Sequence, residues 1–103
     1  MANSFSFNKI KRKYFNVQLK NNKTYLVQMP EKGTFERLIE LKNTVGEEDS
    51  VRELYNCVAM MISNNKQGYK VTAKDIADYT IEEIMEFIKA YMGFVKGITE
   101  EKN

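Results

Sequence analysis

The 103-residue chain contains no histidine and no tryptophan, and it has a single cysteine and a single proline. Without histidine it lacks the side chain whose ordinary pKa lies near neutrality, which removes Ser-His-Asp triads and the usual zinc sites. The lone Cys57 cannot form an internal disulfide, which fits a reducing cytoplasm. No apolar run approaches the roughly 20 residues of a membrane span, and the N-terminus lacks the apolar stretch of a signal peptide. We therefore expect one small, soluble, intracellular domain.

Other arrangements that carry chemistry are also missing. The five glycines form no phosphate-binding loop. Glu82, Glu83 and Glu86 could resemble an acid–base set, but they fall in the first two turns of an expected helix, where capping and solvation explain them. Cys57 is expected to be a small core residue. The sequence thus predicts a protein that is not an enzyme, with no catalytic residues, no cofactor and no metal site.

Charge is distributed unevenly along the chain. Residues 1–29 contain six basic residues and no acidic residue, whereas the remainder contains ten basic and fourteen acidic residues. This asymmetry indicates either an anionic partner or head-to-tail self-association. The possible contacts to an anionic partner are Lys9, Lys11, Arg12 and Lys13. Together with Tyr14 and Phe15 they interleave cations with aromatic residues, as proteins that bind single-stranded nucleic acid do. A nucleic-acid-binding domain usually has a broader basic face, however, so we favour a solvated arm.

Residues 14–29 have the alternating apolar pattern of a β-hairpin. A two-residue loop would place Leu19 opposite Thr24. A three-residue loop, Asn21–Lys23, would place Val17 opposite Val27 and gather the large apolar side chains on one face. We predict the three-residue loop.

Helices are predicted over residues 34–45, 50–64, 73–79 and 80–97. Thr34 is the expected N-cap of the first, and the other three begin with patterns typical of a capping box at Ser50, Thr72 and Thr80. The expected fold is α+β and mostly α: an N-terminal β-hairpin followed by three principal helices and one short helical turn. Residues 1–13 form a basic flexible arm, 14–98 a single globular domain, and 99–103 a frayed tail.

The last helix has a broad apolar face. Apolar positions span about half of its circumference. A helix that packs on a small core usually needs a narrower apolar stripe, of ~100° or somewhat more. Its surplus edge would bind a partner or a second copy, with Met60 extending the surface. The predicted partner-binding residues are Phe87, Tyr91, Phe94, Ile98 and Met60. Alternatively, the helix is sandwiched between the hairpin and the second helix, and the edge is buried.

Two segments carry a resemblance to a known family. They are Ile62-Ser-Asn-Asn-Lys-Gln-Gly-Tyr-Lys-Val-Thr-Ala-Lys-Asp-Ile76 and Ile81-Glu-Glu-Ile-Met-Glu-Phe-Ile-Lys-Ala-Tyr-Met-Gly-Phe-Val95. The pattern resembles the tail assembly chaperones of long-tailed bacteriophages and prophages, in which an "NNK-x-G" turn, a "VTAxDI" short helix and an "IEEIMxFxxAYxxFV" helix follow one another. The resemblance covers the chain from about Leu54 onward and is looser before it.

The resemblance implies a non-catalytic protein of the host bacterial cytoplasm that is absent from the mature virion. Its partners would be the phage tape measure protein, which it keeps from aggregating, the major tail protein, which it recruits, and further copies of itself. Such proteins often occur in a short form and a frameshifted longer form. Glu101-Lys102-Asn103 can be encoded GAA-AAA-AAC, which contains a slippery A-AAA-AAC sequence. A small nucleic-acid-binding regulator of a phage or mobile element, working through the basic arm, is the alternative function.

Overall fold

A computed structural model describes residues 4–44, 46–47 and 49–99, with side chains through residue 97. The elements follow one another as η1 (Phe7–Lys9), β1 (Phe15–Gln18), β2 (Thr24–Val27), α1 (Lys32–Asn43), α2 (Ser50–Ser63), η2 (Ala73–Ile76) and α3 (Ile81–Thr99). The predicted fold class, a hairpin followed by three helices and a short helical turn, is confirmed. The codons proposed for frameshifting belong to residues outside the described ranges.

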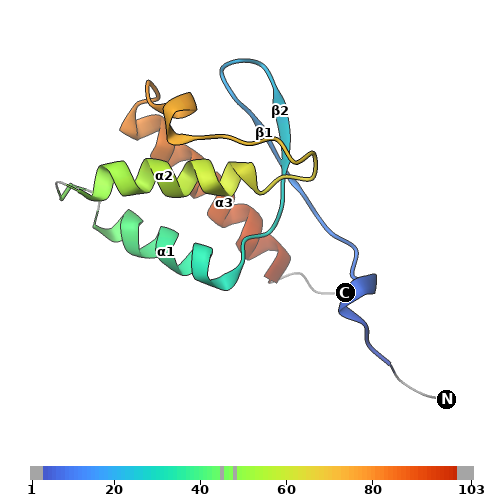
Figure 1. Cartoon of the computed structure of the whole chain (residues 1–103). Helices are drawn as coiled ribbons and strands as arrows, with labels where there is room; N and C mark the ends of the chain where they lie inside the picture. Colours follow the sequence, from blue (N-terminus) through green and yellow to red (C-terminus); the bar gives the residue numbers. More distant parts are fainter. Residues whose placement is uncertain (1–3, 45, 48, 100–103) are drawn as a thin grey trace.

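The helices form two layers beside the hairpin. Helices α1 and α2 run antiparallel, α3 crosses behind them, and the hairpin stands against one end of the helical layer (Figure 1). The N-terminal arm leads away from the foot of the hairpin. One core joins the hairpin, the three helices and η2. Its fully buried side chains include Val27, Leu38, Leu54, Val58, Ile76, Ile84, Ile88 and Tyr91. Among the described residues, no helix has the length and hydrophobicity of a transmembrane span.

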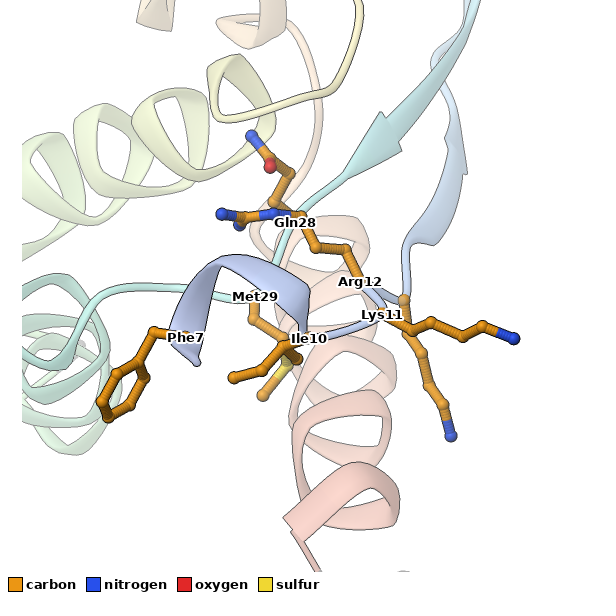
Figure 2. A pocket seen from close by; sticks show the side chains of 7 residues that line it. Phe7, Ile10, Lys11, Arg12, Gln28 and Met29 are labelled. Atoms are coloured by element: carbon orange, nitrogen blue, oxygen red, sulfur yellow. The ribbon is translucent and has the colours of Figure 1, made fainter. Parts of the chain in front are cut away.

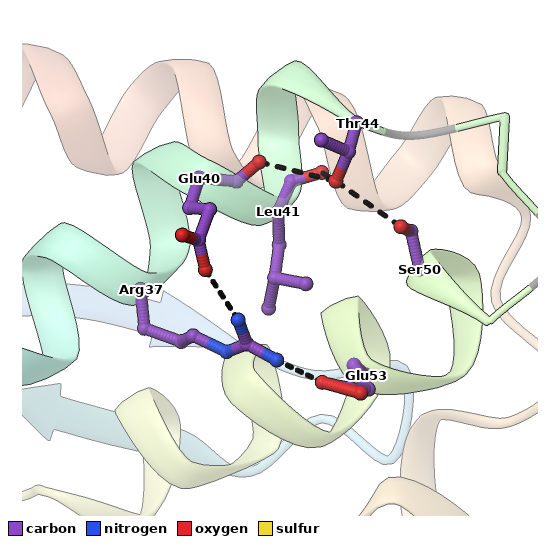
Figure 3. A network of polar contacts seen from close by, with 6 residues as sticks. All are labelled: Arg37, Glu40, Leu41, Thr44, Ser50 and Glu53. Carbon is purple, nitrogen blue, oxygen red and sulfur yellow. Dashed lines mark hydrogen bonds and ion pairs between the residues drawn. The ribbon is translucent and has the colours of Figure 1, made fainter.

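Polar contacts hold α1 and α2 together at their open edge. The Arg37 guanidinium pairs with Glu40 on its own helix and with Glu53 on α2 (Figure 3). Near the turn between the helices, the Ser50 hydroxyl donates to Thr44 Oγ1 at 3.1 Å. The predicted capping box of Ser50 and Glu53 is therefore wrong, because both side chains bind residues of α1 instead, and Asp49 occupies the cap position.

The first helix begins two residues earlier than predicted. It starts at Lys32, and its N-cap is Glu31, which makes no side-chain cap hydrogen bond. The Thr34 cap predicted from the sequence is wrong, since Thr34 lies inside the first turn. Pro30 explains the start, because its fixed φ and missing N–H end the strand, and the helix follows at once. The helix also ends two residues earlier than predicted, at Asn43. After it, the Thr44 hydroxyl donates to Glu40 O and Leu41 O.

The hairpin has the predicted faces but a different register. Val17 lies opposite Tyr25 and Phe15 opposite Val27, so the predicted pairing of Val17 with Val27 is wrong. The loop still has three residues, Lys20–Asn22, with Leu19 N donating to Lys23 O at 3.0 Å. A shift of two residues in pairing leaves every side chain on its original face. The apolar pattern therefore could not separate these registers.

Turn chemistry decides the register. Asn22 has a φ of 69°, in the left-handed region, and its N–H donates to Leu19 O at 2.9 Å. The Asn21 carboxamide oxygen accepts the N–H of Lys23 at 2.8 Å. A three-residue loop with its last residue left-handed is a favoured hairpin connection, and asparagine tolerates that conformation.

The two other predicted capping boxes are present. At η2, the Asp75 carboxylate accepts the N–H of Thr72 at 2.8 Å. At α3, Glu83 accepts the N–H of Thr80 at 2.8 Å and the Thr80 hydroxyl accepts the N–H of Glu83 at 3.0 Å. The same Glu83 oxygen accepts a hydrogen bond from the Lys20 ammonium at 2.8 Å, which ties the hairpin loop to the start of α3. Lys20 and the Thr80 N–H lower the pKa of Glu83.

Replacement of Asn22 tests the observed loop. We expect Asn22→Ala to lower the free energy of unfolding by about 1 kcal/mol, because alanine is strained in the left-handed region. Asn22→Gly is the matched control and should be at least as stable as the parent chain, since glycine adopts this conformation freely. Urea denaturation measures both. Equal stability of the alanine and glycine variants would contradict the observed loop.

The pair of Glu83 and Lys20 predicts a dependence of stability on pH. Because the pKa of Glu83 is lowered in the folded state, its contribution is full above the unfolded pKa and is lost as pH falls through the folded one. Between pH 6 and pH 3, wild type should lose more stability than Glu83→Gln, which keeps an acceptor for the Thr80 N–H. Glu82→Gln removes one carboxylate from the same turn without breaking the ion pair and is the matched control in thermal unfolding. Parallel curves for wild type and Glu83→Gln would show that the pair contributes nothing.

Candidate interaction surfaces

The loop after α2 completes one edge of the hairpin. Gln28 N donates to Asn64 O and Lys66 N donates to Leu26 O, both at 2.9 Å. Gln67 continues the pairing with its side chain, accepting the N–H of Leu26 at 3.0 Å and donating to Thr24 O at 3.1 Å. The segment Asn64–Gln67 thus acts as a short third strand along β2.

A buried asparagine fixes the shape of this loop. Asn65 is 5% exposed, and its side-chain amide donates to Ile62 O and Tyr69 O at 2.7 and 2.8 Å. Its carboxamide oxygen accepts the N–H of Tyr69 at 2.9 Å. Gly68, with a φ of +77°, then turns the chain, as glycine does without strain. The "NNK-x-G" motif is therefore explained by the structure of the turn.

The apolar edge predicted on the last helix is covered by the hairpin. Phe15 packs on Phe94 with ring centroids 5.3 Å apart and reaches Phe87 at 6.2 Å. Both α3 rings are half-buried. Tyr91 is only 1% exposed, and its hydroxyl donates to Gln28 O at 3.1 Å. Its assignment to an exposed partner surface was wrong, since burial makes it part of the core and raises its pKa.

Met60, the other described residue of that predicted surface, does not join Phe87 and Phe94. Met60 is 55% exposed, but it borders one hollow with Pro30 and Thr34 and another with residues 68–73. Neither hollow includes an α3 phenylalanine. The side chain of Ile98 lies outside the described part of the chain. The structure therefore shows the sandwiched helix that the sequence left as the alternative.

The N-terminal arm holds the two most exposed large apolar side chains of the described residues, Phe5 at 71% and Phe7 at 79%. Ile10 is 51% exposed, and the rings of Phe5 and Phe7 meet edge to face at 4.8 Å. Such side chains favour contact with another apolar surface over contact with water. These three residues were not predicted as a site, although apolar side chains placed among the cations of the arm are a visible signal in the sequence.

A hollow of about 380 Å³ lies between the arm and the end of β2. Figure 2 shows Ile10 beside Met29 at its floor, Phe7 on the side nearer α1, and Arg12 extending beside Gln28. Lys11, Arg12 and Lys13 also line the hollow. The same part of the arm therefore carries both apolar and basic side chains. The predicted cations Lys9, Lys11, Arg12 and Lys13 are all exposed.

The described residues offer little catalytic chemistry. Cys57 is buried as predicted, and burial raises the pKa of its thiol, although Arg37 acts against the shift. A thiol in that state is a poor nucleophile. Across residues 4–44, 46–47 and 49–99, no group of three histidine, cysteine, aspartate or glutamate side chains is arranged to hold a metal ion. Every buried side-chain polar atom there has a hydrogen-bond partner.

Comparisons with protein-family models, with curated proteins and with solved structures give no match.

The packing of Phe15 against α3 predicts the behaviour of a double variant. Phe87→Glu with Phe94→Glu should lower the free energy of unfolding by about 3 kcal/mol or more, because two carboxylates would enter a half-buried aromatic cluster. Met60→Glu, at an exposed helical site, is the control and should change it by less than about 0.5 kcal/mol. Guanidinium denaturation measures both. A double variant as stable as the control would restore the surplus edge predicted from the sequence.

Proposed function

We propose that this chain is a non-catalytic chaperone of bacteriophage tail assembly. It binds the tape measure protein, recruits the major tail protein and associates with further copies of itself in the host cytoplasm. The observation that carries the proposal is the arm, which holds Phe5, Phe7 and Ile10 in solvent beside an apolar hollow. A chaperone for long helical segments needs such a surface, because the faces it must protect are apolar.

The site is suited to a helix that lies across the arm. Phe7 and Ile10 face the hollow that Met29 lines, and a methionine adapts its shape to different apolar side chains. None of the described arm residues 4–13 is buried, so contacts between the arm and a partner need not disturb the core. An apolar side chain inserted between Phe7 and Met29 would be removed from water on both sides.

The resemblance to tail assembly chaperones supports the same conclusion by a separate route. Its "NNK-x-G" motif builds the third-strand segment, its "VTAxDI" motif contains the cap of η2, and the last motif forms α3. These motifs therefore describe a scaffold, with no residue reserved for catalysis. The apolar arm is outside the resembling segments, so partner choice would be set by a part of the chain that differs from the pattern.

Binding by the arm can be separated from folding. Phe5→Ser, Phe7→Ser and Ile10→Ser together should reduce co-purification of the phage's tape measure protein at least tenfold, because the apolar contact is lost. The free energy of unfolding should stay within about 0.5 kcal/mol of wild type, as these side chains are exposed. Ile39→Ser with Ile81→Ser removes exposed apolar groups from the helical layer and should leave capture intact. Undiminished capture by the arm variant would exclude the arm as the binding site.

A further inference from the structure

The folded chain separates its charges more sharply than the sequence order suggests. Residues 1–30 and 54–74 together contain nine basic residues and no acidic residue, whereas the rest contains seven basic and fourteen acidic residues. The two basic segments are distant in sequence, but the pairing of Asn64–Gln67 with β2 brings them side by side. The loop therefore extends the basic arm into a longer basic surface.

Two tyrosines of this surface carry cations on their rings. Lys66 Nζ lies 5.5 Å from the centroid of Tyr14, joining the loop to the foot of the hairpin. Lys23 Nζ lies 4.3 Å from the centroid of Tyr69, joining the loop to the hairpin tip. Tyr69 is 42% exposed. We call three arm cations and these two pairs the basic–aromatic strip; it comprises Lys9, Lys11, Arg12, Tyr14, Lys23, Lys66 and Tyr69.

The cations of the strip have no carboxylate partner within the described residues, in contrast to cations elsewhere. Arg37 pairs with two glutamates and Lys20 pairs with Glu83. None of the strip's five cations forms an ion pair in the described part of the chain. At the hairpin tip, Lys23 shares a hollow with Asp75 and Asp78. The positive charge available to an anionic ligand therefore lies mainly along the arm and at Lys66.

We propose that the basic–aromatic strip binds single-stranded nucleic acid. A polyanion with a charge at each repeat matches a row of cations without carboxylate partners, and planar bases match the aromatic rings that accompany those cations. An acidic protein, including the acidic helices of a second copy, would use the cations but not the rings. Several acids of those helices are also occupied, because Glu40, Glu53 and Glu83 already pair within the chain. The proposal does not depend on the chaperone function, because it rests on the cations and tyrosine rings of the strip and not on Phe5, Phe7 or Ile10.

Fluorescence anisotropy with a labelled oligothymidylate tests the proposal on the full chain. Binding should be measurable at 50 mM salt and should weaken with a log–log salt slope of roughly −0.7 for each phosphate contact. Lys11→Ala, Arg12→Ala and Lys66→Ala together should weaken it at least tenfold and make the slope shallower by about 2. The matched control is Lys32→Ala, Lys42→Ala and Lys89→Ala, which removes the same charge from the helical layer and should change affinity by less than about threefold.

Variants of Tyr14 distinguish nucleic acid from an acidic protein. Tyr14→Ala should weaken oligothymidylate binding about fivefold or more, whereas Tyr14→Phe should retain it, since stacking needs the ring and not the hydroxyl. Polyglutamate should bind more weakly than oligothymidylate and should not respond to Tyr14→Ala. The proposal is overturned if no oligothymidylate binding occurs at 50 mM salt, or if the two cation triples have equal effects. It is also overturned if polyglutamate binds as tightly and Tyr14→Ala changes neither ligand.

Discussion

A two-stranded hairpin is marginally stable in water by itself, and each of its strands has an edge with unpaired backbone groups. Here the loop Asn64–Gln67 covers the edge of β2, using two backbone hydrogen bonds and the carboxamide of Gln67. Buried Asn65 holds the loop in the shape that this pairing needs. The hairpin is thereby fixed to the end of α2, and its inner face can pack on α3.

The consequences of this pairing reach both sides of the hairpin. On the inner side, Phe15 is held over Phe87 and Phe94, and the Tyr91 hydroxyl reaches Gln28 O. On the outer side, Lys66 is placed over Tyr14. One loop therefore completes the core and also positions the cations of the basic–aromatic strip. Because the loop has this double role, we expect little tolerance of substitution at Asn64, Asn65 and the following Gly68.

Local sequence patterns predicted the helices and strands better than they predicted which residues those elements contact. The capping boxes at Thr72 and Thr80 are correct because their hydrogen bonds close within four residues. The box at Ser50 is wrong because Arg37, sixteen residues before Glu53, offers that carboxylate an ion pair. Local sequence shows which groups can bond, but it does not show a competing partner that the fold brings near. The hairpin register failed differently, since apolar alternation cannot distinguish registers two residues apart.

For the candidate site, too, local sequence does not show which distant residues pack together. The width of the apolar face on α3 could be derived from the sequence, but the cover that Phe15 gives it could not, because the two are more than seventy residues apart. With that edge covered by Phe15, the arm residues Phe5, Phe7 and Ile10 form a group of exposed apolar side chains in the described part of the chain.

In the sequence, the basic charge of the arm is too local for a nucleic-acid surface. Folding extends it by adding Lys66 and Lys23, each with a tyrosine ring, to the cations of the arm. The arm thus carries apolar and basic side chains around one hollow. Protein binding and polyanion binding depend on different side chains of this segment, so separate substitutions can test each of them.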